Sequence, residues 1–152
     1  MIRTLPARPE DIDFLYHLYA STRLDEIRAW GWDETMQTSF LSLQWKAQQH
    51  SYTQLFPNSV NHIVLADEVR AGRMLTFRDG QQLRLIDIAL LPKYRNQGIG
   101  TVLIRELQKE AVAATLPLCL SVLSTSPAVQ LYHRLGFVKV SGDELYDSMV
   151  WG

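Results

Sequence analysis

The segment of the sequence best suited to chemistry is basic, contains glycines and runs from Pro92 to Gly100. It reads Pro-Lys-Tyr-Arg-Asn-Gln-Gly-Ile-Gly and follows an apolar run of strand length. The start of a helix offers unpaired backbone N–H groups and the positive end of the helix dipole, and glycines let the backbone approach an anion closely. Lys93 and Arg95 add positive charge. The segment therefore predicts a phosphate-binding turn between a strand and a helix.

Three kinds of phosphate-binding glycine loop are distinguished by the spacing of their glycines. The dinucleotide pattern G-x-G-x-x-G requires a third glycine where this chain has Leu103. A Walker A loop requires Gly-Lys followed by Ser or Thr, and the chain contains no such tripeptide. The remaining pattern, R-x-x-G-x-G over Arg95–Gly100, resembles the acetyl-CoA-binding signature of the GNAT N-acetyltransferase superfamily.

A second segment, Ala128–Phe137, supports the same resemblance. It is similar to the A-x-x-L-Y-x-x-x-G-F pattern of that superfamily, with Leu131, Tyr132 and Gly136 at the corresponding places. The chain is therefore identified as a member of the superfamily, which implies one domain over residues 1–152. The implied fold is mixed α/β, with a central, mostly antiparallel, twisted sheet of about six or seven strands flanked by helices. The sheet is expected to splay between the strands before and after the cofactor-loop helix.

The resemblance implies acetyl-CoA as the cosubstrate and assigns its contacts. The pantetheine arm is expected along the backbone of Ile88, Ala89 and Leu90. The pyrophosphate is expected at the residues of the loop and the helix start, namely Arg95, Asn96, Gln97, Gly98, Ile99, Gly100 and Thr101. Many members carry Asn just before the second helix, where this chain has Thr125 and Ser126. We expect Ser126 to cap that helix and to contact the cofactor weakly or through water.

The same resemblance implies that Tyr132 is the general acid toward the departing CoA thiolate. A backbone N–H, most simply that of Leu90, is expected to stabilise the oxyanion. For the general base, Asp87 is the first candidate because it interrupts an apolar strand, where burial raises the pKa of a carboxyl group. Glu26, expected in a helix-to-helix connection, and an ordered-water relay are alternatives. Two structural alternatives exist for Asp87: a pair with an arginine, or a role in holding a strand bulge open.

Residues 22–57 correspond to the segment that covers the substrate opening in this superfamily. Trp30 and Trp32, which flank Gly31, are predicted to line the acceptor pocket, where aromatic rings receive a cationic amine. Trp45 and Phe40 are predicted instead to pack the second helix on the sheet. A polyamine, an aminoglycoside, an amino acid and a protein N-terminus all fit this composition.

The positions of these residues depend on alternating strands and helices without an internal repeat. Strands are predicted at 2–5, 63–66, 74–77, 83–91, 118–123, 137–140 and 144–151, with a hairpin turn at Asp79-Gly80. A first helix is predicted to begin at Pro9, and a second to span about 33–50. A third is predicted to follow the glycine turn and to end after Ala114, before Pro117, and a fourth to span 126–136. Each of the first three helices is expected to bury one apolar face. In the first helix this face contains Ile12, Leu15, Tyr16, Leu18 and Tyr19, and in the second it contains Phe40, Leu43 and Ala47. In the third it contains Ile99, Leu103, Leu107, Ala111 and Ala114.

The composition restricts the class of protein. Lys and Arg number 15 against 16 Asp and Glu, for a formal net charge of -1, which argues against nucleic-acid and membrane-surface partners. The chain has no signal-peptide core and no apolar stretch of membrane-spanning length, so we expect a cytoplasmic protein. Two arrangements of the last strand are open: a sheet edge, which suits a homodimer, and a monomer with Trp151 in its own core.

The single cysteine and the four histidines are not expected to be functional. Cys119 lies in an apolar strand and is predicted to be a small core residue. The histidines lack ligand spacing, so no metal is expected.

The resemblance therefore implies an acyltransferase that moves an acetyl group from acetyl-CoA to a primary amine of a small molecule or peptide. Transfer is expected by direct attack in a ternary complex. A catalytically silent acyl-CoA-binding or regulatory module is the alternative, and it does not require Tyr132.

Overall fold

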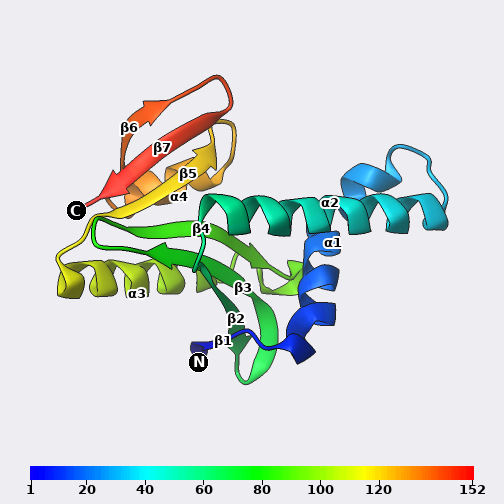
Figure 1. Cartoon of the computed structure of the whole chain (residues 1–152), viewed down its shortest axis with the longest axis horizontal. Helices are drawn as coiled ribbons and strands as arrows, with labels where there is room; N and C mark the ends of the chain where they lie inside the picture. The colour runs from blue at the N-terminus through cyan, green and yellow to red at the C-terminus, as the bar shows by residue number, and fades with distance from the viewer. The chain divides into compact units, whose positions relative to one another are not determined.

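The computed structural model describes all 152 residues of the chain. Its elements, in chain order, are β1 (Ile2–Pro6), η1 (Pro9–Asp11), α1 (Ile12–Arg28), α2 (Glu34–Leu55), β2 (Val60–Ala66), β3 (Val69–Arg78), β4 (Leu83–Leu90), η2 (Pro92–Tyr94), α3 (Ile99–Ala114), β5 (Leu118–Leu123), α4 (Ala128–Arg134), β6 (Val138–Gly142) and β7 (Tyr146–Trp151) (Figure 1). The strands form one seven-stranded sheet in the order β1-β2-β3-β4-β5-β7-β6. This mixed α/β architecture confirms the predicted fold class.

The chain divides into two compact units. The first comprises Met1–Leu75 with Ile88–Arg95, and the second comprises Thr76–Asp87 with Asn96–Gly152. Strands β3 and β4 contribute residues to both units. No helix of the chain has both the length and the apolar character needed to cross a membrane.

The core of the first unit lies between α1 and the β1–β2 pair. Strands β1 and β2 are antiparallel, with Leu5 opposite Ile63. Ile63 and Leu65 alternate along β2 and pack with Leu15 of α1, and Phe14 and Trp45 cover the cluster. Because side chains alternate across a strand, one face of β2 supplies this core. The packing role predicted for Trp45 is confirmed.

The buried faces of α1 and α2 differ in part from the prediction. Leu15 and Leu18 are buried as expected, but Ile12 is 51% exposed because it begins α1 directly after the η1 turn. On α2 the predicted face is wrong, since Leu43 is 70% exposed and Leu41 is buried. Gln37, Gln48 and Gln49 of α2 are half-buried, so counting apolar residues alone misplaces this face.

The start of α2 follows the expected capping rule, but its end does not match the predicted boundary. The Asp33 side chain accepts a hydrogen bond from the Met36 N–H at 2.8 Å and caps the helix. The helix continues past His50 to Leu55 and ends just before Pro57, where proline cannot continue it.

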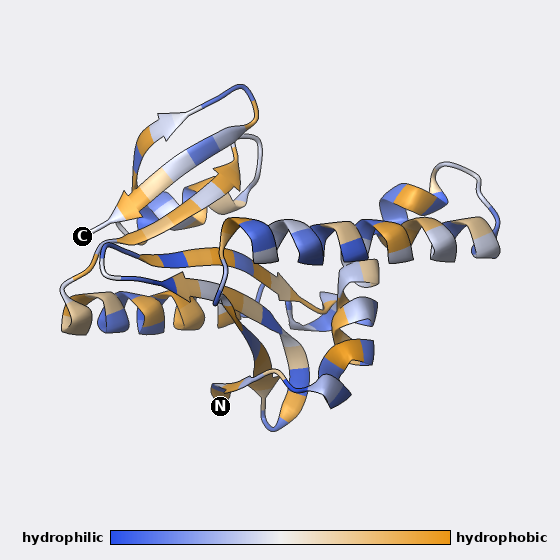
Figure 2. Ribbon diagram, in the orientation of Figure 1, coloured by the Kyte–Doolittle hydropathy of each residue, from blue (hydrophilic) through white to orange (hydrophobic).

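The core of the second unit lies between α3 and β5. The buried residues of α3 form one stripe, consisting of Ile99, Leu103, Ile104, Leu107, Gln108 and Ala111. Figure 2 shows apolar and polar colours alternating along α3, as an amphipathic helix requires. The buried side chains of β5 are every second residue, Leu118, Leu120 and Val122. Both α3 and α4 contact this strand. The predicted bounds of β5 are confirmed.

The strands of the second unit correct one expectation about the chain end. Strand β7 pairs antiparallel with β5 from Leu118↔Trp151 to Leu123↔Tyr146, and β6 pairs with its other side. The last strand is therefore interior and β6 is the edge strand, so of the two arrangements left open for the chain end the sheet-edge one is wrong. The parallel β4–β5 register covers only Leu83–Leu85 with Leu118–Leu120, so Ile86 and Asp87 lie beyond it, as the predicted splay requires.

The C-terminus of α3 places a β-branched residue in a left-handed conformation. Thr115 has φ +56°, where glycine is the favoured residue. We expect Thr115→Gly to raise the free energy of unfolding by about 0.5–1 kcal/mol. Ala114→Gly, one residue earlier in the regular helix, should lower it by a similar amount. Urea unfolding of both variants checks this, and a loss of stability in Thr115→Gly would contradict it.

Candidate functional site

The N-terminus of α3 presents backbone N–H groups without a side-chain cap. Gly98 occupies the N-cap position with φ +81°, and Asn96 is also left-handed with φ +60°. The Gly98 carbonyl accepts the first helical hydrogen bond from the Val102 N–H at 3.1 Å, while no side chain caps this end. The N–H groups of the first turn and the helix dipole together form an anion-binding terminus.

Gly100, in the first turn of α3, leaves open space beside this terminus. A Cβ added at Gly100 would meet no heavy atom within 4 Å, and its φ is not in the left-handed region. Neither packing nor backbone conformation in the folded chain therefore requires glycine at this position. The space beside the free N–H groups suits a phosphate that approaches the backbone closely, so the residues present fit the pyrophosphate of CoA.

In the first unit, the last residues of β4 lie unusually close to β3. A Cβ at Gly72 of β3 would lie 2.2 Å from the Ala89 carbonyl oxygen and 3.1 Å from the Leu90 Cα. The Leu91 N–H donates to the Ala71 carbonyl at 2.8 Å, and Arg95 Nε donates to the Leu90 carbonyl at 3.0 Å. The predicted cofactor strand Ile88–Leu90 therefore follows a path that only glycine on β3 permits.

Sequence reasoning missed Gly72 because the predicted strand begins only at Met74, whereas β3 begins at Val69. A glycine inside an otherwise regular strand commonly marks a bulge or a close backbone approach.

The second motif forms the C-terminal stop of α4. The Phe137 N–H donates to the Tyr132 carbonyl at 3.0 Å, and the Gly136 N–H donates to the His133 carbonyl at 3.0 Å. Gly136 has φ +96°, which completes a Schellman motif. The rings of Tyr132 and Phe137 are in contact, with centroids 5.6 Å apart. The spacing Y-x-x-x-G-F is thus that of a helix stop that holds the tyrosine ring against a buried phenylalanine.

The surroundings of Tyr132 keep its hydroxyl protonated. Burial raises the pKa of Tyr132, and the negative charge of Asp87 raises it further. An acidic group with a raised pKa contributes stability below its unfolded pKa and loses that contribution as pH rises through its folded pKa. Near neutral pH, Tyr132 is therefore a neutral phenol with a proton to donate.

The two carboxylates predicted as bases have different surroundings. Asp87 of β4 is half-buried and lies close enough to Tyr132 to influence its pKa, so the structure brings these two predicted residues together. Glu26 is exposed and forms an ion pair with Arg23 at 3.3 Å. It lies in the last turns of α1 rather than in a connection, so its predicted location is wrong.

The predicted acceptor residues form an aromatic cluster with a third ring. The centroids of Trp30 and Trp32 are 5.2 Å apart, and Phe40 lies 5.4 Å from Trp30 and 5.3 Å from Trp32. Trp30 remains 43% exposed. Phe40, predicted to pack on the sheet, packs instead against the α1–α2 connection.

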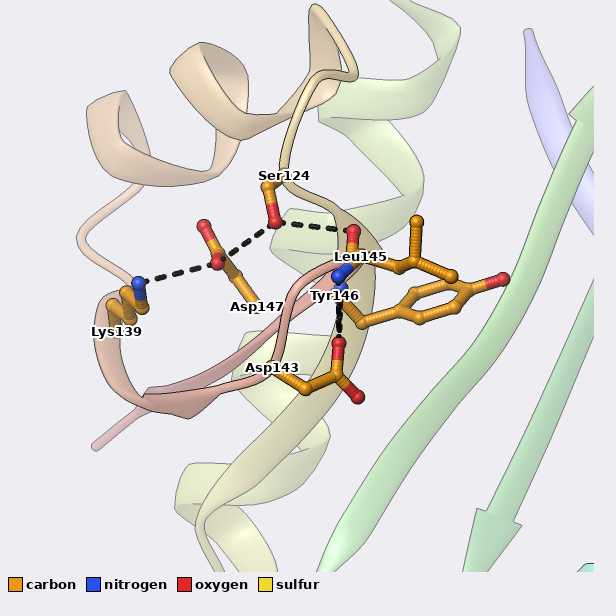
Figure 3. Close-up of polar contacts among 6 residues, drawn as sticks. All are labelled: Ser124, Lys139, Asp143, Leu145, Tyr146 and Asp147. Carbon is orange, nitrogen blue, oxygen red and sulfur yellow. Dashed lines mark hydrogen bonds and ion pairs between the residues drawn. The ribbon is translucent and has the colours of Figure 1, made fainter.

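The polar residues around β5 support the loop that leads into α4 (Figure 3). Ser124 Oγ lies 3.0 Å from the Leu145 carbonyl oxygen and 3.2 Å from Asp147 Oδ1, and Lys139 Nζ lies 3.3 Å from the same carboxylate oxygen. Asp143 accepts hydrogen bonds from the N–H groups of Tyr146 and Leu145, which lower its pKa. The turn before β7 and the end of β5 are thereby tied together.

Two further predictions concern this part of the second unit. Ser126 Oγ accepts a hydrogen bond from the Ala128 N–H at 3.1 Å, so its capping role is confirmed. Cys119 is half-buried, and burial raises the pKa of its thiol, with Arg84 opposing this more weakly. A protonated thiol is a poor nucleophile. The chain has no group of three or more His, Cys, Asp or Glu side chains arranged to hold a metal ion.

The uncapped start of α3 and Tyr132 in α4 lie in the two sequence segments that resemble the GNAT superfamily. The profile of the acetyltransferase (GNAT) domain family matches residues 58–139. The chain belongs to the GNAT acetyltransferase family. No curated protein sequence matches it.

Solved structures share the fold over nearly the whole chain. The PaiA N-acetyltransferase of Thermoplasma acidophilum, in complex with coenzyme A, has a TM-score of 0.71 and 18% identity, covering 99% of this chain and 98% of that one. The ribosomal-protein-S18-alanine N-acetyltransferase of Escherichia coli has a TM-score of 0.66 and 20% identity, with 99% and 92% covered. The N-acetyltransferase PseH of Campylobacter jejuni, in complex with acetyl coenzyme A, has a TM-score of 0.64 and 15% identity, with 99% and 98% covered. At these identities the likeness establishes the fold.

The close approach at Gly72 predicts a sharp response to a single methyl group. In Gly72→Ala the Cβ would overlap the Ala89 carbonyl oxygen, so β4 must shift, and we expect the free energy of unfolding to fall by about 2–3 kcal/mol. Gly80→Ala is the matched control, because its Cβ meets no atom within 4 Å, and its change should stay within about 0.5 kcal/mol. Equal stabilities of the two variants in urea would contradict the assigned contact.

Proposed function

We propose that this protein transfers the acetyl group of acetyl-CoA to a primary amine by direct attack in a ternary complex. The observation that carries the proposal is the uncapped start of α3 with open space at Gly100, in a domain of the GNAT family. Two solved relatives of the same fold contain coenzyme A or acetyl coenzyme A, which supports the same ligand here.

The cofactor contacts we propose follow the chain from β4 into α3. The backbone of Ile88–Leu90 holds the pantetheine amides, and the residues Arg95–Thr101 hold the pyrophosphate. Ser126 uses its hydroxyl to cap α4, so we assign it at most a water-mediated cofactor contact. Acetyl-CoA, when bound, supplies an activated thioester carbonyl.

The proton transfers we propose use Asp87 and Tyr132 as a pair. Asp87 takes one proton from the substrate ammonium, and the free amine attacks the thioester carbonyl, whose oxyanion the Leu90 N–H stabilises. The C–S bond then breaks, and Tyr132 donates its proton to the departing sulfur. The amide nitrogen gives up its second proton through water to the Tyr132 oxygen, which restores the phenol, and Asp87 releases its proton to solvent. Protonation of Asp87 removes the charge that raises the pKa of Tyr132, so the tyrosine becomes a stronger acid when its proton is needed. Glu26 and an ordered-water relay are the alternative bases.

For the acceptor, we propose an amine whose apolar or flat body contacts Trp30 and Trp32. The exposed part of Trp30 supports this, because an aromatic face attracts a cation or an apolar group. Relatives of this fold are named for different activities, among them the S18-alanine N-acetyltransferase, so the acceptor must be found by experiment.

The proposed activity is tested by release of free CoA thiol from acetyl-CoA across a panel of amines. The panel should contain polyamines, aminoglycosides, amino acids and peptides with a free N-terminus. We expect at least one class to release thiol well above the rate without amine. Thermal stabilisation by CoA without thiol release from any amine would instead support the silent binding module.

The acid role of Tyr132 predicts a loss of turnover without a loss of cofactor binding. We expect Tyr132→Phe to lower kcat by roughly 10²–10⁴-fold and to change the acetyl-CoA Kd less than twofold. The alkaline limb of the native kcat profile should lie above about pH 10, the ordinary phenol pKa, and should vanish in this variant. Tyr16→Phe, in the core of the first unit, is the control. An unchanged kcat in Tyr132→Phe would remove this residue from the mechanism.

The open space at Gly100 predicts opposite effects on stability and affinity. Gly100→Ala adds a methyl group that meets no protein atom in a helix that favours alanine, so the free energy of unfolding should rise by about 0.5–1 kcal/mol. The same methyl group occupies the space assigned to the pyrophosphate, so the Kd of CoA should rise at least tenfold. Calorimetric titration with CoA and urea unfolding check both effects. Native affinity in this variant would refute the assigned site.

A further inference from the structure

Gln108 is the polar member of the buried stripe of α3. It is 7% exposed and shares that stripe with five apolar residues. A buried amide without a hydrogen bond costs free energy that an apolar side chain of the same size does not. The position of Gln108 therefore calls for a specific hydrogen-bond partner.

That partner is a backbone carbonyl at the end of α4. Gln108 Nε2 donates to the Leu135 carbonyl oxygen at 2.9 Å. Leu135 is the C-cap residue of α4, where carbonyl groups have no partner within the helix. Gln108 thus caps α4 from a neighbouring helix.

The capped turn is the one that holds Tyr132. The Tyr132 carbonyl accepts hydrogen bonds from the N–H groups of Leu135 and Phe137, at 3.1 and 3.0 Å. The Tyr132 ring contacts the ring of Phe137 in the same turn. A displacement of the Leu135 carbonyl would therefore move the backbone and the ring of Tyr132 together.

We propose that Gln108 is a positioning residue, which holds the last turn of α4 so that the Tyr132 hydroxyl stays in place for proton donation. The inference rests on the proposed function, because it assumes that Tyr132 is the acid. Gln108 lies ten residues after Gly98, or about 15 Å along the helix at 1.5 Å per residue. One rigid helix thereby sets both the phosphate-binding terminus and the turn that carries the acid.

The proposal is tested by a double-mutant cycle with the amine that gives the fastest thiol release. Gln108→Met keeps the size of the side chain but removes the donor. We expect it to lower kcat by roughly 10- to 100-fold, since misplacement by about 1 Å costs that much. The KM for acetyl-CoA should change less than twofold. In the Tyr132→Phe background the same substitution should lower kcat less than twofold further.

A titration of tyrosine absorbance supplies a readout that needs no acceptor. The difference between each chain and its Tyr132→Phe counterpart isolates Tyr132, and Gln108→Met should lower its pKa because a looser turn exposes the ring. Gln130→Met, on the exposed side of α4, is the matched control and should leave both readouts unchanged. If Gln108→Met does not fold, Gln108→Asn takes its place. It keeps the amide but shortens the side chain, so that the amide no longer reaches the Leu135 carbonyl.

The outcomes separate this inference from the proposed function. Equal losses of kcat from the Gln108 substitution with and without Tyr132, or an unchanged Tyr132 titration, would overturn the positioning role while the acid role stands. An unchanged kcat in Tyr132→Phe would overturn both.

Discussion

The structure depends on a helix start that the protein leaves without a cap. Most helices satisfy their first N–H groups with a side chain, as Asp33 does for α2, whereas α3 begins at a left-handed glycine with no side-chain acceptor. Free donors at the positive end of a dipole favour a bound anion. The apolar stripe of α3 compensates by anchoring the helix on β5. The buried face thus stabilises the helix, and the exposed start stays open for the proposed ligand.

The position of the short helix α4 depends on α3. Seven residues make a helix too short to be stable alone. Its position comes from contacts at both ends, with Ser126 at the start and with Gly136, Phe137 and Gln108 at the stop. These contacts leave Tyr132 with a neutral hydroxyl beside the charge of Asp87. The same few hydrogen bonds that stabilise α4 therefore also position Tyr132, the acid in the proposed mechanism.

Local sequence signals predicted much of this arrangement, and what they missed depends on contacts between distant residues. Strand β5, the α3 stripe and the Ser126 cap follow from periodicity and capping chemistry and were predicted within a residue or two. The buried face of α2 was misplaced because glutamines share it. The interior position of β7 depends on strand order, which no local pattern encodes. Gln108 was missed because its partner, Leu135, lies far along the chain. Gly72 was missed because the start of β3 was predicted too late.

The most direct test of the central claim is an amide NMR titration of the ¹⁵N-labelled protein with CoA. Glycine amides resolve well, and the chain offers internal controls at Gly80 and Gly142, where no ligand is assigned. The account predicts that the Gly98 and Gly100 signals shift strongly and saturate with CoA, while the two control signals stay in place. Saturable binding of CoA that leaves Gly98 and Gly100 unshifted would contradict it.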